Sequence, residues 1–226
     1  MFPPRFPARC YGMGKAVLDL SSKPLRRSFM PKKRPISALS RIVARPVPGG
    51  DRWKGRLHAG FLVLPCALGR AGVVTDKREG DHASPRGDFS LLGGFFRSDR
   101  LRRPACRLAL RPLRREMGWC DDADSFLYNR PMILSLAEFS VGPLAGGPRH
   151  EVMWRKDSLY DIVFQLDHNQ NPRMRGRGSA IFLHCARPDP ARPGQFAPTE
   201  GCVALPLPVL RKLLPLLAPH CRLRIG

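Results

Sequence analysis

Short apolar runs broken by proline and glycine dominate the pattern of the chain. Residues 159–166 alternate between apolar and polar positions and predict a half-buried strand, with Tyr160, Ile162, Phe164 and Leu166 on one face. Residues 57–68 combine strand-forming residues with a proline, which predicts an edge strand or two short strands. Residues 221–225 alternate as a final strand. Because the runs are short and turn residues frequent, the pattern predicts a mainly β fold with few helices.

Three consecutive elements are predicted near the C-terminus. Residues 179–185 predict a strand with Ala180, Phe182 and His184 on one face and Ile181, Leu183 and Cys185 on the other. Residues 187–198 contain four prolines and one glycine, which predicts an irregular loop. Residues 206–214 predict a helix that begins on a proline.

The strand and the loop present a candidate nucleophile and base. His184 stands near the end of the predicted strand, and Cys202 follows Gly201 eighteen positions later. A histidine that takes a thiol proton makes cysteine a good nucleophile, so we expect His184 to keep Cys202 ionised. The predicted helix would lower the thiol pKa further if its N-terminus lay close. The backbone amides of Gly201 and Cys202 would then face a developing oxyanion.

Charge is unevenly distributed along the chain of 226 residues, whose net charge is +21. Basic residues and prolines recur from residue 1 to 45, so we expect a disordered basic segment there and one domain over 46–226. A basic surface favours acidic polymers, but the segment lacks interleaved aromatic residues, and we expect no specific nucleic-acid partner. No apolar run is long enough for a transmembrane helix, and no convincing signal peptide is visible.

The seven cysteines leave two other readings of Cys202 open. The number is odd and no CxxC motif occurs, so the pattern predicts no dense disulfide framework. Cys202 alone would also fit a buried structural thiol. A zinc site would need to draw on His184, Cys185, Cys202, His220 and Cys221, whose spacing is not that of zinc fingers.

Several motifs together resemble one known family. The segment Thr199–Val203 after His184 is similar to the Ser/Thr-x-Gly-Cys signature of the L,D-transpeptidase (YkuD-like) catalytic domain. Residues 84–89 resemble its Thr-Pro-x-Gly-x-Phe element, and residues 119–122 and 154–161 resemble one branch of it. The resemblance covers roughly residues 46–226 and implies a single β-sandwich-like domain with a short helix after the catalytic cysteine.

The resemblance also implies an activity. Cys202 would be the nucleophile and His184 the general base and acid, with Gly201 supplying an oxyanion-hole amide. The backbone of Cys185 would orient His184. It also implies substrate contacts at Thr199, Tyr160, Asp161 and Asn169. Apart from the resemblance, Arg177 and Arg187 flank the predicted histidine strand, so we expect either one to pair with a substrate carboxylate. The substrate would be a peptidoglycan stem peptide, joined through a Cys thioester to an amine of a second stem, with inhibition by carbapenems and no metal or organic cofactor.

Two alternatives remain open from the sequence. Water could replace the amine acceptor, which would make the protein a carboxypeptidase or endopeptidase. A non-catalytic basic module that binds wall polymer or nucleic acid would instead leave Cys202 without a role. The substrate class implies a periplasmic or wall-facing location.

Overall fold

The fold is that of a computed structural model, which describes residues 38–226. The predicted disordered segment lies mostly in residues 1–37, outside the described residues. Its C-terminal boundary at residue 45 is wrong, because strand β1 (Leu39–Pro46) pairs with two other strands. Ile42 and Ala44 of this strand are fully buried. The folded domain therefore already includes Leu39, and the high content of basic residues hid this first strand.

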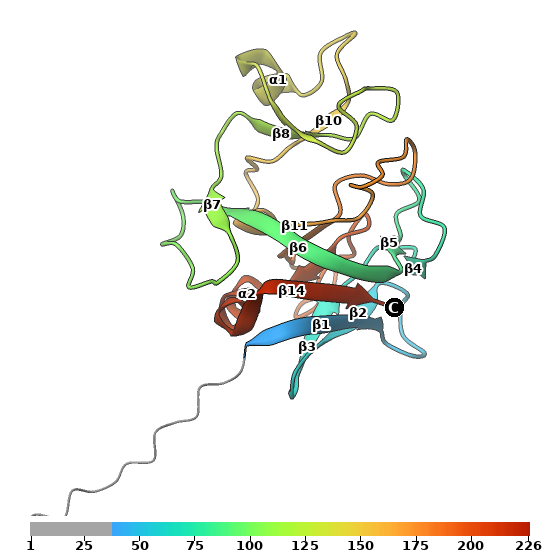
Figure 1. The fold of residues 1–226 in the computed structure, drawn as a ribbon, viewed down its shortest axis with the longest axis vertical. Coiled ribbons are helices and arrows are strands. Elements are labelled where there is room, and N and C mark those ends of the chain that lie inside the picture. Colours follow the sequence, from blue (N-terminus) through green and yellow to red (C-terminus); the bar gives the residue numbers. More distant parts are fainter. Residues whose placement is uncertain (1–37) are drawn as a thin grey trace, which may run out of the picture. The chain divides into compact units, whose positions relative to one another are not determined.

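A nine-stranded mixed sheet forms most of the domain (Figure 1). In spatial order its strands are β11 (Ile162–Leu166), β12 (Phe182–Cys185), β13 (Val203–Leu205), β3 (Leu62–Ala67), β2 (Lys54–Ala59), β1, β14 (Leu217–Ile225), β6 (Gly87–Phe96) and β7 (Leu110–Pro112). The long strand β6 pairs with β14 through its first half and with β11 through its second half. The sheet thus curls back on itself, and one continuous sheet encloses the core.

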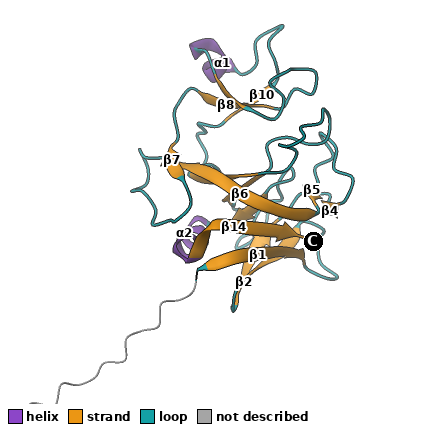
Figure 2. Ribbon diagram, in the orientation of Figure 1, coloured by secondary structure: helices purple, strands orange, loops and turns teal. Residues whose placement is uncertain are grey.

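The remaining elements are short (Figure 2). They are β4 (Val73–Val74), β5 (Ser84–Pro85), the small sheet β8 (Met117–Cys120), β9 (Pro131–Ile133) and β10 (His150–Val152), and the helices α1 (Leu136–Val141), α2 (Leu207–Leu213) and η1 (Leu214–Leu216). The fold is therefore mainly β with few short helices, as predicted, and α2 follows Cys202. None of the helices in residues 38–226 combines the length and hydropathy that crossing a bilayer requires.

Two predictions about strands are refined by the structure. Residues 57–68 form parts of the antiparallel pair β2 and β3, in agreement with the reading as two short strands. The strand predicted over 159–166 starts only at Ile162 and is buried on both faces, because β6 and β12 flank it and two core clusters cover it. Tyr160 precedes β11 and packs with Val163, not with Ile162 as the alternation predicted.

Candidate active site

Two neighbouring parallel strands bring the candidate residues together. His184 lies on β12, and its Cα partner on β13 is Ala204, two residues after Cys202. Phe182 and Ala180 pack in the same cluster as Cys202, whereas Ile181, Leu183 and Cys185 belong to the main core. The predicted alternation is therefore correct. The strand itself begins only at Phe182, because Ala180 has a φ of +50° and interrupts the extended backbone.

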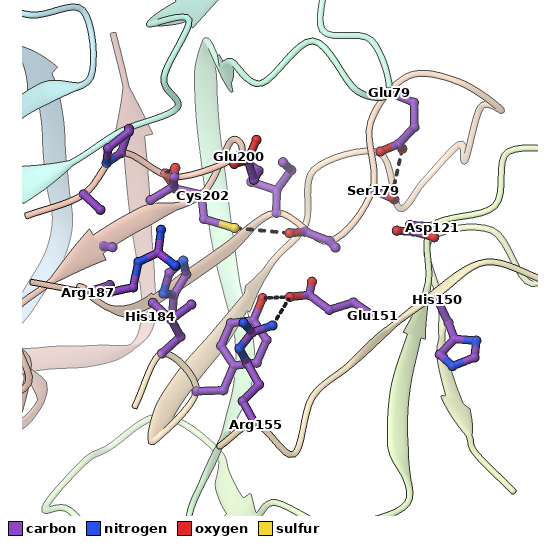
Figure 3. Close-up of a pocket in the computed structure, with 18 residues that line it drawn as sticks. Glu79, Asp121, His150, Glu151, Arg155, Ser179, His184, Arg187, Glu200 and Cys202 are labelled. Carbon is purple, nitrogen blue, oxygen red and sulfur yellow. Dashed lines mark hydrogen bonds and ion pairs between the residues drawn. The ribbon is translucent and has the colours of Figure 1, made fainter. Parts of the chain in front are cut away.

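Cys202 and His184 line the same pocket, whose volume is about 520 Å³ (Figure 3). Its charged and hydroxyl-bearing residues come from five regions of the chain. They are Glu79, Asp121, His150, Glu151, Arg155, Tyr160, Ser179, His184, Arg187, Thr199 and Glu200. Both side chains therefore face one space that is large enough for a peptide substrate.

Backbone contacts fix the orientation and tautomer of His184. Its Nδ1 lies 2.8 Å from the carbonyl oxygen of Cys185. A carbonyl can only accept a hydrogen bond, so Nδ1 carries the proton and Nε2 of the neutral ring is left as the base. The ring also packs edge-to-face on Tyr160, with centroids 5.4 Å apart. Burial lowers the His184 pKa to about 4, so the imidazole is neutral at pH 7.

Cys202 is a buried, protonated thiol. Its Sγ donates to the carbonyl oxygen of Ala180 at 3.3 Å and accepts from the Phe182 amide at 3.4 Å. Burial raises the Cys202 pKa to about 12, while the Phe182 amide works in the opposite direction. The expectation of a thiolate held ionised by His184 is therefore wrong for the resting protein. Nor does the helix N-terminus lie beside the sulfur, because the three residues of β13 separate Cys202 from α2.

The loop before Cys202 is held by its own hydrogen bonds. The Thr199 hydroxyl donates to the Cys202 carbonyl at 2.7 Å and accepts from the Gly201 amide at 3.2 Å. Gly201 has a φ of +144°, and a Cβ there would stand 2.9 Å from the Ala83 carbonyl oxygen, so only glycine fits. We predicted that the Gly201 amide would donate to an oxyanion. In the structure this amide donates to the Thr199 hydroxyl instead. The Cys202 amide donates to no acceptor within residues 38–226.

The other predicted substrate contacts divide into two groups. Thr199, Tyr160 and Arg187 line the pocket, and Arg187 is exposed and forms no salt bridge within the described part of the chain. Asp161, Asn169 and Arg177 are not among the residues that line it.

Each of these three side chains has a structural partner instead. Asp161 pairs with Arg100 at 2.8 Å. Asn169 bonds the backbone of Met174 and Gly178, and Arg177 pairs with Asp76. Their contacts hold parts of the chain together. A sequence pattern alone does not distinguish such a structural role from contact with substrate.

Sequence reasoning missed the acidic side of the pocket. Glu151 accepts from the Tyr160 hydroxyl at 2.7 Å and lies 3.4 Å from the Arg155 guanidinium. Glu79 accepts from Ser179 at 2.8 Å and from the Tyr128 hydroxyl. These partners come from segments far apart in the sequence, so only the tertiary fold assembles them. Next to Asp121, Asp122 accepts hydrogen bonds from the backbone amides of Asp124 and Arg149.

The zinc reading finds no support in the geometry. Cys185 and Cys221 belong to the main core cluster, whereas Cys202 belongs to the second cluster. Within residues 38–226, no three His, Cys, Asp or Glu residues are grouped as metal ligands.

Comparison with known proteins identifies the family of the chain. The family model of the L,D-transpeptidase catalytic domain, YkuD, matches residues 54–225. Neither the curated proteins nor the solved structures include a match to the chain. The matched segment contains the pocket, the histidine strand and the loop that ends in Cys202. The chain therefore belongs to the L,D-transpeptidase catalytic-domain family.

Proposed function

We propose that the protein is a cysteine acyltransferase that acts on peptidoglycan stem peptides. The carrying observation is that Cys202 and a histidine with Nε2 left as base line one pocket of about 520 Å³. Family membership supports the substrate class. The thiolate attacks the carbonyl that precedes a terminal D-residue, and a thioester forms as that residue leaves.

Substrate binding triggers ionisation of the nucleophile in this mechanism. The resting thiol and imidazole are both neutral, because burial raises one pKa and lowers the other. His184 Nε2 takes the thiol proton as the sulfur attacks, so an ion pair exists only along the reaction path. The Phe182 amide, 3.4 Å from Sγ, stabilises the developing thiolate. His184 then returns the proton to the departing amine.

Two groups are suited to bind the acyl donor. The Cys202 amide has no acceptor within residues 38–226 and would donate to the oxyanion. Gly201 supports this geometry through its backbone conformation, since its own amide is bound to Thr199. Arg187 lies on the side of the pocket near His184 and would bind the terminal carboxylate of the donor (Figure 3).

The thioester is resolved by an amine of a second stem, which creates a cross-link, or of another amine-bearing partner. The same thioester can be resolved by water, and then the protein is a hydrolase. Wall substrate implies a periplasmic or wall-facing location and inhibition by carbapenems.

Product analysis tests the proposal. Purified protein incubated with disaccharide tetrapeptide muropeptides should yield muropeptide dimers that mass spectrometry detects, together with the released D-residue. The Cys202→Ala variant should yield neither product. Shortened monomers without dimers would show that the protein is a hydrolase and not a transferase. Unchanged muropeptides after incubation with wild-type protein would contradict both activities.

A further inference from the structure

The pocket separates its charges in a way that the acylation half of the reaction does not explain. Arg187 lies with His184 on one side, and Glu79 and Asp121 lie on the other, with Glu151 between them (Figure 3). The chain as a whole carries a net charge of +21, so this acidic side opposes the general charge. A ligand that binds here would present a cation to that side.

Glu151 is the acid whose carboxylate is best placed to meet a reacting group. One oxygen, Oε1, accepts from the Tyr160 hydroxyl at 2.7 Å and faces Arg155 at 3.4 Å. Arg155 itself forms a two-bond pair with Asp157 at 2.9 and 2.8 Å. The other oxygen, Oε2, accepts no hydrogen bond within residues 38–226 and points into the pocket on the side of Cys202 (Figure 3).

Glu151 and Cys202 also interact electrostatically, and the charge of Glu151 affects the pKa of the thiol. Burial raises the Glu151 pKa, while Tyr160 and Arg155 oppose that rise. The charge of Glu151 in turn raises the Cys202 pKa, after burial itself. A carboxylate near the thiol therefore impedes formation of the thiolate. Such a carboxylate is unfavourable for acylation of Cys202, so we looked for a role in the second step, in which the amine attacks the thioester.

Polar atoms deeper in the pocket point in the same direction. Asp121 Oδ1 and His150 Nε2 are buried and have no partner in the part of the chain that the structure describes. His150 is only 7% exposed, and both residues line the pocket. Buried polar atoms without partners are costly, so a polar ligand group that enters this side is favoured.

We propose that Glu151 is the acceptor-site residue, which binds the side-chain ammonium of the incoming diamino-acid stem and takes its proton. This rests on the proposed function and names the residue that selects an amine over water.

The step is balanced as follows. The ammonium gives one proton to Glu151 Oε2, and the neutral amine attacks the thioester carbonyl of acylated Cys202. The carbon–sulfur bond breaks as the amide forms. The second amine proton passes through His184 to the departing sulfur, which restores the thiol. Glu151 releases its proton to solvent, and no oxidant or cofactor is needed.

Glu151→Gln tests the inference, because glutamine keeps the size and the acceptor for Tyr160 but removes the charge. Acylation of Cys202, followed by release of the D-residue from the tetrapeptide muropeptide, should stay within about three-fold of wild type. Dimer formation should fall about 100-fold, the scale of a lost general base. Glu151→Asp keeps the charge and should recover dimer formation to within about ten-fold of wild type.

A neutral nucleophile separates binding of a cation from a merely structural role. Hydroxylamine is uncharged at neutral pH and should cleave the acyl-enzyme equally fast in wild type and Glu151→Gln. Glu116→Gln, an acid outside the pocket, should change neither reaction. Equal loss with both nucleophiles, or undiminished dimer formation, would overturn the role of Glu151. Absence of any acyl-enzyme in wild type would instead overturn the proposed function.

Discussion

At the scale of single residues, burial keeps both Cys202 and His184 neutral at rest, and the proposed mechanism charges them only during reaction. Sequence spacing singled out Cys202 and His184 as the candidate pair, because a histidine near a strand end and a Gly-Cys dipeptide form a local pattern. Their protonation states could not be predicted, since they depend on burial by the tertiary fold, including Tyr160, which packs on His184 from another segment of the chain. Glu151 could not be predicted either, because no local pattern sets its position relative to Cys202.

The pKa of His184 predicts a loss of stability in acid. Burial lowers this pKa from 6.5 to about 4. In the unfolded chain His184 therefore takes up a proton as the pH falls below 6.5, whereas in the folded protein it stays neutral down to about pH 4. Stability is therefore fully present above pH 6.5 and falls across this window. Between pH 7 and pH 5 the free energy of unfolding should drop by about 2 kcal/mol through His184 alone.

Chemical denaturation at the two pH values measures this effect. The His184→Asn variant is the control, because all other groups titrate in both proteins. Its loss between pH 7 and pH 5 should be smaller than that of wild type by the same ~2 kcal/mol. Equal losses in the two proteins would show that the imidazole is not held neutral by the fold.

At the scale of elements, the loop Thr199–Cys202 holds Cys202, the proposed nucleophile, in place. The sequence indicated this loop through its signature and indicated the strand and helix around it. It could not show that the Thr199 hydroxyl ties Gly201 to Cys202, since the same residue types also occur as substrate ligands. The strand β12 begins later than predicted for a similar reason. Ala180 has a φ of +50°, which an alanine adopts only where tertiary contacts require it.

Thr199→Val removes the hydroxyl with little change in shape. The Gly201 amide then loses its acceptor, which costs about 1–3 kcal/mol of stability for a buried group. We expect the rate of Cys202 acylation to fall at least about ten-fold, because small displacements of reacting groups are costly. Thr199→Ser keeps the hydroxyl and should remain close to wild type in melting temperature and acylation rate. A fully active valine variant would refute this role of the hydroxyl.

At the scale of the whole molecule, composition pointed correctly to a mainly β domain but gave no guide to the chemistry. Proline and glycine content predicted short strands and many turns. The closure of the sheet could not be predicted, because it depends on the single strand β6 pairing with both β14 and β11. The net charge of +21 suggested an acidic polymer as partner, yet the pocket itself carries Glu79, Asp121 and Glu151.

The central claim is that Cys202 becomes acylated. The most direct measurement is the intact mass of the protein after exposure to a carbapenem, which opens its strained ring on a reactive thiol. We predict one adduct on wild-type protein, none on Cys202→Ala, and an unchanged adduct on Cys106→Ala, whose thiol is more accessible but outside the pocket. An unmodified wild type, or an adduct that persists in Cys202→Ala, would contradict the account.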